Sequence, residues 1–383
     1  MAKKRDVRVA LTDLVGGGVR YLAGAQKTDG SFAGAVWSDL AYHVPHFDYH
    51  AGGSHHFRTP GSSGLAFLKV ADRLPELDLR RKAEHAYDWI CTCQHDDGGL
   101  FEITNNDRPS QFHLDYERSA ISLGMVTQGM FKAIGLGLEK KPQYVDFLIK
   151  AAEWQMTVEV APGNFLHSEG YPEQYVILNA NAHAAETLQI AATLTDDADQ
   201  AVAWRSGAER AIGAILSAQR SSGMFPYRTP DEGQHTISYT ATCVWVLQNL
   251  IDAGMLPRET VERQIRHACS FLADSVDEQG RLLWEGREVH GQKYHTWVYG
   301  MVMRCLTWWR HPDWDEDAER ALSFVHGELF NPTVGLARLY DFPLGEDRVV
   351  CGHPCVAAEE YACAFNQADL LDCLIDVESL LCG

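Results

Sequence analysis

A glycine-containing turn recurs six times along this chain, and this repeat constrains the fold more than any other feature. Each time, a helix-like stretch is followed by a glycine and, two residues later, an apolar side chain; the glycines are Gly30, Gly98, Gly163, Gly223, Gly280 and Gly335. Neighbouring glycines are 55 to 68 residues apart, a length that holds two helices of ordinary size and two connections. The repeat therefore indicates an array of helical hairpins.

Two kinds of helix are expected to alternate between these glycines. Residues 125–134 are apolar, and residues 143–154 follow with the 3.6-residue period of a helix that buries one face. The same order returns in three further pairs, which are 176–194 with 201–219, 239–251 with 259–272, and 294–309 with 315–330. The first helix of each pair is small and apolar, as an inner helix should be, and the second carries more charge, as an outer helix should.

Each end of the chain supplies half of a hairpin. Residues 11–26 form an outer-type helix with no clear inner helix before it, and residues 356–374 form an inner-type helix without an outer partner. The two halves can complete each other and close a ring. We therefore predict an all-α fold, an (α/α)6 toroid in which residues 1–383 form one domain around a central cavity. An open helical solenoid is the alternative, and few strands are expected.

The composition is that of a globular protein with a strongly acidic surface. Hydrophobic residues make up 46% of the chain, and the net charge is −19. Such a surface repels polyanions, which disfavours a nucleic-acid partner. No stretch approaches the roughly 18–20 apolar residues of a membrane span. The basic start has no apolar segment behind it, so we expect a cytoplasmic protein whose ten cysteines are free thiols.

The turns resemble a known repeat. Gly18, Tyr21, Leu22, Gln26, Asp29, Gly30 and Phe32 are spaced as in the glutamine–aromatic repeat of the terpenoid cyclase and protein prenyltransferase superfamily, and residues 86–100 give a second match. The resemblance implies the toroidal fold, in which this turn joins an outer helix to the next inner helix. It implies little about chemistry, because toroid enzymes that act on sugars carry similar turns.

Polar residues concentrate where the inner helices begin. These helix starts should meet at one mouth of the cavity, where their partial positive charge favours an anionic ligand. Tyr, His, Asn, Arg and Glu side chains there suit a hydroxylated, charged substrate, either a small molecule or an oligosaccharide, and can supply an acid, a base and a carboxylate clamp. The predicted catalytic residues are Tyr294, His295, Tyr239 and His183. The predicted substrate-binding residues are Tyr116, Glu117, Arg118, Asn179, Asn181 and Glu360.

Three short segments resemble uronate C5-epimerases of the glucuronyl type. They are Glu169-x-Tyr171-Pro172 before Leu178-Asn179, Ser122-x-x-Met125-x-x-Gln128-Gly129, and Tyr294-His295-Thr296. The first departs from that family, which continues with Gly where this chain has Ala180. The resemblance implies an enzyme of polysaccharide biosynthesis that removes the C5 proton of a uronate and neutralises the enediolate that forms. Tyr294 or His295 would be acid or base, and Arg118, Asn179 or His183 would bind the carboxylate. Return of the proton gives an epimerase, and loss of the C4 substituent gives a lyase.

Isoprenoid chemistry is the competing class. Residues 313–317 contain four acidic side chains and a tryptophan, similar to the acidic motif of class II cyclases, but they lie at the start of an outer helix, where acidic side chains favour the helix N-terminus. A prenyltransferase zinc site could use His295 and Cys243, but Ala241 stands where an Asp is needed. A toroid that only binds a partner is the third possibility.

Two further clusters could hold a metal ion. His43, His46, His50, His55 and His56 crowd one loop, and Cys351, His353 and Cys355 form a short motif. Structural zinc normally takes four ligands, and the second cluster has three. We expect neither a metal nor a cofactor.

Overall fold

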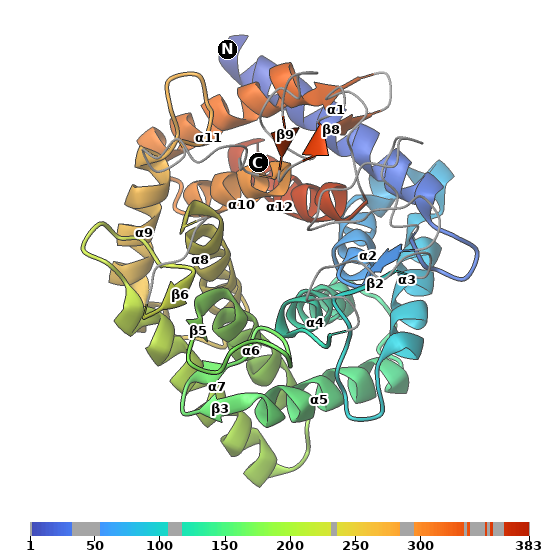
Figure 1. Ribbon diagram of the computed structural model, residues 1–383. Coiled ribbons are helices and arrows are strands. Elements are labelled where there is room, and N and C mark those ends of the chain that lie inside the picture. Colours follow the sequence, from blue (N-terminus) through green and yellow to red (C-terminus); the bar gives the residue numbers. More distant parts are fainter. Residues whose placement is uncertain are drawn as a thin grey trace.

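Twelve α-helices follow one another around a ring in the part of the chain that the structure describes (Figure 1). The structure is a computed structural model, and it describes residues 2–32, 54–105, 117–230, 236–283, 295–332, 335–337, 349–350, 353–354 and 364–382. The outer helices are α1 (Ala2–Ala25), α3 (Leu79–Cys93), α5 (Pro142–Thr157), α7 (Ala198–Ala218), α9 (Glu262–Asp274) and α11 (Pro312–Phe324). The inner helices are α2 (Thr59–Val70), α4 (Ala120–Gly135), α6 (Leu178–Ala192), α8 (Thr236–Asp252), α10 (Thr296–Thr307) and α12 (Ala364–Cys382).

The inner helices carry small side chains because other parts of the protein cover them on every side. Every residue of α6 is buried, whereas the outer helix α3 buries one stripe of its surface. Glycines let the inner helices approach closely: a Cβ at Gly129 in α4 would overlap the carbonyl oxygen of Gly61 in α2. The Ala- and Gly-rich composition of the inner segments is therefore a consequence of backbone packing.

The two ends of the chain close the ring. Helix α12 packs between α10 and α2, and α1 covers it from outside, beside α11 (Figure 1). A Cβ at Gly17 in α1 would lie 2.7 Å from the carbonyl oxygen of Gly335, so the sixth turn packs directly on the first helix. The predicted (α/α)6 toroid is confirmed, and the open solenoid is wrong. Of the last predicted inner helix, 356–374, the described part is helical from Ala364, and the helix continues to Cys382; residues 356–363 lie outside the described residues.

All six turn glycines adopt the left-handed backbone conformation. Their φ angles lie between 75° and 96°, a region that side chains with a Cβ rarely occupy. Packing adds a second constraint, because a Cβ at Gly98 would overlap the carbonyl oxygen of Lys150 in the next outer helix. Glycine is thus required both by the turn and by the neighbouring hairpin.

The glutamine of the repeat joins one hairpin to the next. The side-chain amide of Gln94 donates to the carbonyl of Gly98 in its own turn and to that of Phe147 in α5, both at 3.0 Å. Gln26 and Gln219 make the corresponding pairs of hydrogen bonds. The four-residue spacing of glutamine and glycine therefore ties each of these three turns to the next outer helix.

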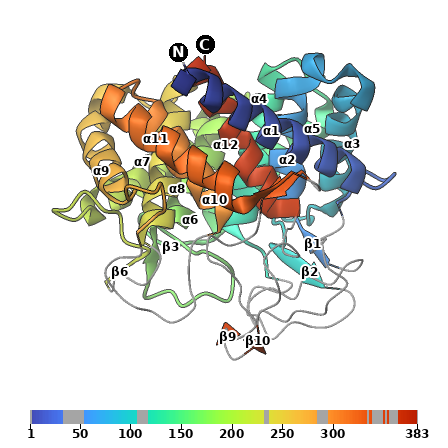
Figure 2. The ribbon, with the colours of Figure 1, turned by 90° about the horizontal axis from the view of Figure 1, so that it is seen from above.

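Short antiparallel strand pairs and single turns of helix complete the described structure. The pairs are β1 (Ser54–His56) with β2 (Ile103–Asn105), β3 (Glu159–Ala161) with β4 (Asn164–Phe165), β5 (Val176–Ile177) with β6 (Arg228–Thr229), β7 (Phe330–Asn331) with β8 (Leu336–Ala337), and β9 (Val349–Val350) with β10 (His353–Pro354). The short helical segments are Ala71–Arg73, Pro75–Leu77, Arg258–Thr260 and Val325–Leu329. Figure 2 shows strands gathered on the face where the inner helices begin, with both chain termini on the opposite face. We call these faces the N-terminal mouth and the C-terminal mouth.

No helix among the described residues is both long enough and apolar enough to span a membrane. The seven cysteines that the structure describes are free thiols, and four of them are fully buried.

Candidate active site

Arg58 lies at the N-terminal mouth, at the start of α2. Its Nε atom is 3.3 Å from a carboxylate oxygen of Asp369 in α12, and its side chain is 12% exposed. The guanidinium also lies over the ring of Phe365, 4.5 Å from the centroid, and over that of Trp297 at 5.7 Å. A cation is therefore held by one carboxylate and two aromatic faces, at the place where inner helices from both ends of the chain meet.

The carboxylate partner of Arg58 is deeply buried. Asp369 is 1% exposed and accepts a 2.7 Å hydrogen bond from the hydroxyl of Ser62. Burial raises the pKa of Asp369, while the charge of Arg58 opposes the rise. The counter-ion of Arg58 is thus a carboxylate, Asp369, whose ionised form is disfavoured by burial.

Two histidines close to Arg58 are kept neutral. Burial, together with the charges of Arg58 and His167, lowers the pKa of His183 in α6 to about 3. Burial also holds the pKa of His56 well below its ordinary value, with added effects of Arg58 and His295. Neutral imidazoles are proton acceptors at neutral pH.

Aromatic rings connect the histidines of this mouth. The ring of Phe365 lies 4.5 Å from that of His56 and 6.2 Å from that of His295, measured between centroids. His295 is the residue that precedes α10, and its ring is also 6.2 Å from that of Trp297. The same aromatic pair, Phe365 and Trp297, therefore contacts Arg58 and His295.

Three tyrosines form a second group at the mouth. The ring of Tyr239 in α8 stacks on that of Tyr227 at 4.3 Å, and the Tyr171 hydroxyl donates to the Tyr227 hydroxyl at 3.3 Å. Burial raises the pKa of Tyr239, followed by the negative charge of Glu102, while Arg58 opposes this. Tyr239 therefore keeps its proton at neutral pH.

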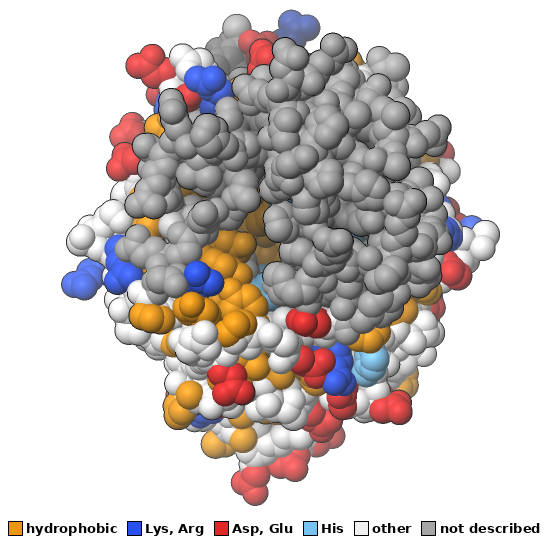
Figure 3. Space-filling view, viewed as in Figure 1, with side chains coloured by type: hydrophobic (Ala, Val, Ile, Leu, Met, Phe, Trp, Pro, Cys, Tyr) orange, Lys and Arg blue, Asp and Glu red, His pale blue; other side chains and the backbone are white. Residues whose placement is uncertain are grey.

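Several buried polar atoms at this mouth have hydrogen-bonding capacity that no described residue uses. They are His56 Nδ1, Ser63 Oγ, Ser122 Oγ, Asn179 Oδ1, His183 Nδ1 and Thr236 Oγ1. Buried polar atoms in proteins are nearly always paired. Their number at one mouth indicates a site for a ligand rich in hydroxyl groups. Figure 3, which views this face, shows hydrophobic side chains gathered beside a hollow near its centre.

The structure brings part of the predicted site together. His183 and Tyr239 lie close enough to Arg58 for its charge to shift their pKa values, and His295 shares the Phe365 and Trp297 rings with Arg58. Asn179 is 5% exposed, one helical turn before His183. Tyr116, Tyr294 and Glu360 lie outside the described residues.

The other three predicted residues are engaged elsewhere. Asn181 is fully buried and fixes the third turn, accepting from the Phe165 amide at 3.1 Å and donating to the Gly163 carbonyl at 2.6 Å. Arg118 forms ion pairs with Asp97 and Glu169. Glu117 accepts a 2.5 Å hydrogen bond from the hydroxyl of Ser168. These three side chains thus have partners within the protein, and substrate binding by them stays a prediction.

Sequence reasoning missed Arg58, His56 and Asp369 as site residues. Arg58 directly precedes Thr59-Pro60, a helix start that was hidden by the Gly- and Ser-rich sequence of α2. Asp369 is one of four acidic residues in α12. Each residue is visible in the sequence, but its role depends on the ion pair between them, which joins distant parts of the chain.

The motifs of the competing functions do not gather at the mouth. Asp313 and Asp315 occupy the first turn of the outer helix α11, and Asp317 pairs with Arg320. Cys243 is buried, which raises the pKa of its thiol. Within the described ranges, no group of three or more His, Cys, Asp or Glu side chains could hold a metal ion. Of the two expected clusters, His43, His46, His50, Cys351 and Cys355 lie outside those ranges.

Comparison with known proteins bears on the fold. No family model and no curated protein matches this chain. Among solved structures, cellobiose 2-epimerase from Bacillus thermoamylovorans B4167 is 13% identical, with 98% of this chain and 99% of that chain covered and a TM-score of 0.67. A D-mannose isomerase is 12% identical over 96% and 97%, also at 0.67. A protein described as a glycosidase is 11% identical over 98% of both chains, again at 0.67. The chain therefore has the same (α/α)6 toroid fold as these proteins over nearly its whole length.

Proposed function

We propose that this chain is a carbohydrate epimerase or isomerase that moves a proton on the carbon next to a sugar carbonyl group. Structures of the same fold bear the names cellobiose 2-epimerase, D-mannose isomerase and sugar epimerase. The observation that carries the proposal is the cluster at the N-terminal mouth, where Arg58 stands among neutral histidines. The unused hydroxyl and amide groups around it suit a sugar and not a hydrocarbon, so the isoprenoid alternative is disfavoured.

The neutral histidines supply the base. A proton next to a carbonyl is weakly acidic, and its removal leaves the electron pair shared with the carbonyl oxygen as an enediolate. His183 has a low pKa in the free protein because it is buried beside positive charge. The negative charge that develops on the substrate raises the pKa of an adjacent imidazole, so the base strengthens as the reaction proceeds.

Arg58 supplies the charge that the enediolate needs. It is a permanent cation at the mouth where the inner helices begin, and the partial positive charge of those helix ends adds to it. Return of the proton to the same carbon from the opposite face gives an epimer. Return to the former carbonyl carbon gives the aldose–ketose isomer. His295, His56 and Tyr239 are the described groups placed to return it.

C5 epimerisation of a uronate is the second candidate. The segment that resembles the uronate epimerases, Glu169 to Pro172, contributes Tyr171 to the tyrosine group of the mouth. In a uronate, the carboxylate is the activating group, and Arg58 would bind it because Asp369 is a counter-ion with a raised pKa. Loss of the C4 substituent after the same proton abstraction would make the enzyme a lyase.

Solvent exchange tests the proposal directly. D-Mannose, D-glucose, cellobiose and D-glucuronate are incubated with the protein in D2O, and NMR follows loss of the C2–H and C5–H signals. Exchange at C2 of an aldose supports the first candidate, and exchange at C5 of the uronate supports the second. His183→Asn should slow the exchange by about 1,000-fold, whereas His267→Asn, the same change on the exposed face of α9, should not. Absence of exchange with every sugar, or full exchange in the His183 variant, contradicts the proposal.

A further inference from the structure

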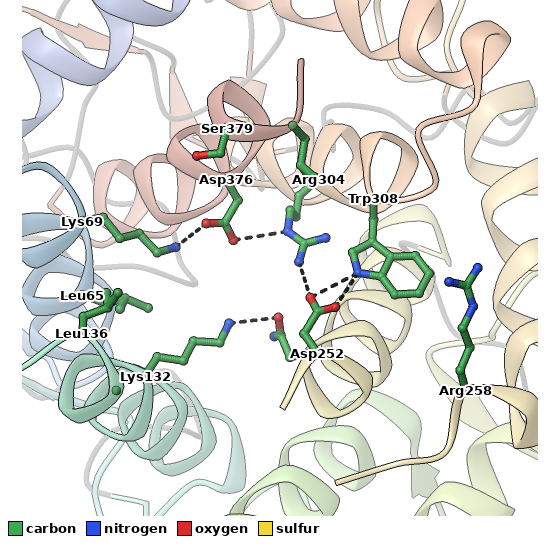
Figure 4. Close-up of a pocket in the computed structure, with 13 residues that line it drawn as sticks. Leu65, Lys69, Lys132, Leu136, Asp252, Arg258, Arg304, Trp308, Asp376 and Ser379 are labelled. Atoms are coloured by element: carbon green, nitrogen blue, oxygen red, sulfur yellow. Dashed lines mark hydrogen bonds and ion pairs between the residues drawn. The ribbon is translucent and has the colours of Figure 1, made fainter. Parts of the chain in front are cut away.

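Two adjoining cavities open at the C-terminal mouth, on the far side of the ring from the proposed active site. The first has a volume of about 620 Å³ and is polar; its lining includes Lys69, Lys132, Asn249, Asp252, Arg304 and Asp376 (Figure 4). The second, of about 420 Å³, is mainly apolar and is lined by Phe131, Ile190, Leu250 and Met255 among others. We call them the polar bay and the apolar slot. Lys132, Gly135, Asn249 and Asp252 border both, so the two are continuous.

Three of the cations that line the polar bay already have carboxylate partners. Lys69 contacts Asp372 and Asp376, each at 2.7 Å. Arg304 contacts Asp376 at 3.2 Å and also pairs with Asp252. The third, Arg258, is half exposed and pairs with Glu262 at the start of α9. These pairs make a largely neutralised wall.

Lys132 differs from them. Within the described part of the chain it forms no ion pair; its ammonium donates to Asn249 Oδ1 at 2.9 Å and lies 5.7 Å from the ring of Trp245. An ammonium group has three N–H bonds, so two are unused. Figure 4 shows the Lys132 side chain directed into the bay. Burial raises the pKa of Glu186, which lines the slot, to about 7, and the charge of Lys132 opposes this rise.

Asn249 adds a second unused donor at the same place. It is 3% exposed, and its amide nitrogen donates to no described residue. At the junction of bay and slot, the N–H groups without a described partner therefore belong to Lys132 and Asn249, while inside the slot Glu186 Oε2 also has none. The N–H groups are complementary to an acceptor-rich anion.

We propose that the C-terminal mouth binds an organic monocarboxylate, with its carboxylate on Lys132 and Asn249 and its apolar body in the slot. The two oxygens of one carboxylate match the N–H groups of Lys132 and Asn249 that have no partner among the described residues. The carboxylates of Asp252 and Asp376, which also line the bay, would repel a dianion such as a phosphate ester. The combined volume is in the range of cavities that hold small organic ligands. This site is independent of the proposed sugar chemistry.

Calorimetry with three probes of equal chain length tests the proposal. Octanoate carries the carboxylate, 1-octanol has the same chain without charge, and octyl phosphate carries the larger charge. Octanoate should bind the full-length protein at least about ten-fold more tightly than either of the others. Lys132→Met should weaken octanoate binding at least about ten-fold. Lys150→Met, the same change on the outer surface of α5, should leave it unchanged.

Asn249→Asp provides a test that keeps the size of the side chain. It replaces the amide donor with a carboxylate and should abolish octanoate binding by repulsion, while circular dichroism confirms an intact fold. The proposal is overturned by any of four results. These are no octanoate binding, equal or tighter binding of 1-octanol, tighter binding of octyl phosphate, or unchanged affinity in both the Lys132 and Asn249 variants.

Discussion

The two mouths of the ring are built from opposite ends of the same inner helices, and their polar residues differ accordingly. At the N-terminal mouth, histidines are buried without charge around Arg58, and several polar atoms lack a partner among the described residues. At the C-terminal mouth, Lys69 and Arg304 are tied to carboxylates in a nearly complete network. The polar groups of the N-terminal mouth can therefore form hydrogen bonds and ion pairs with a ligand. Most charged groups of the C-terminal mouth are already paired with one another.

The helix termini account for much of this difference. Inner helices end at the C-terminal mouth, where their partial negative charge favours cations in the last turns, such as Lys69 in α2 and Lys132 in α4. At the N-terminal mouth the sign is reversed, which disfavours protonated histidine and favours an anionic intermediate. The ring therefore separates the proposed enediolate site from a site whose cations are favoured by the ends of the inner helices.

The largest expected effect comes from removing one arginine at each mouth. Arg58→Gln should lower kcat by about 1,000-fold or more, because it removes the charge that stabilises the enediolate. Arg258→Gln at the C-terminal mouth should leave kcat unchanged, since its guanidinium is half exposed and paired with Glu262. Steady-state kinetics on the sugar found by the exchange screen measures both. Equal losses of kcat in the two variants would contradict a special role of the N-terminal mouth in catalysis.

Turn glycines at the two mouths should respond differently to a methyl group. Gly98 and Gly137 have nearly the same φ, 91° and 94°, but a Cβ at Gly98 would overlap the backbone of Lys150 whereas one at Gly137 meets no described atom within 4 Å. Gly137→Ala carries only backbone strain, about 1 kcal/mol. Gly98→Ala adds a steric clash and should cost about 4 kcal/mol in total. Denaturant unfolding measures the difference, and equal costs would refute the packing argument.

Glu186 should make stability fall with rising pH. Its pKa is raised in the folded state from 4.5 to about 7, so the folded protein binds a proton that the unfolded chain has released over that interval. The unfolding free energy should therefore decline as pH rises from about 4.5 through 7, by up to about 3 kcal/mol. Glu186→Gln should remove this decline and be more stable than the wild type at pH 8. Denaturant unfolding at pH 5, 6, 7 and 8 measures it.

The comparison with the variant isolates this carboxyl group. His183, one turn earlier in α6, has the opposite sign: its lowered pKa means that stability is lost as pH falls from 6.5 toward about 3. Both proteins carry that histidine, so its effect cancels in their difference. A difference that does not change with pH would mean that Glu186 is ionised at pH 5 in the folded protein.

The fold was readable from the sequence because its turns leave little choice. A positive φ and a neighbouring backbone together require glycine, so the six glycines mark the hairpins. Helix α2 was not recognised as an inner helix. Its sequence, Thr59-Pro-Gly-Ser-Ser-Gly, has the composition of a loop, yet eleven of its twelve residues are buried. Close packing among inner helices outweighs helix propensity there.

The site was only partly readable. Asn179 and His183 are four residues apart and share a helix face, and both are buried at the mouth. By the same geometry Asn181, halfway between them, faces away, and it bonds to the turn that precedes its helix. The Arg58–Asp369 pair joins the first inner helix to the last, and one sequence does not reveal which distant residues a closed ring brings together.

The smallest expected change in unfolding free energy concerns two glutamines, of which Gln94 forms the hydrogen bonds of the repeat and Gln155 does not. Gln94→Ala should destabilise the protein by about 1–2 kcal/mol, because it removes two hydrogen bonds and leaves the Gly98 and Phe147 carbonyls without that donor. Gln155, at the end of α5, is fully buried, yet neither of its amide atoms bonds to a described residue. Its turn glycine, Gly163, is eight residues away instead of four, which puts it out of reach. Gln155→Met should therefore be neutral or slightly stabilising, because it buries an apolar group of similar size in place of an unpaired amide. Thermal unfolding compares the stability of the two variants. A larger loss of stability at Gln155 would show that these glutamines act through something other than the hydrogen bonds between the turn and the next outer helix.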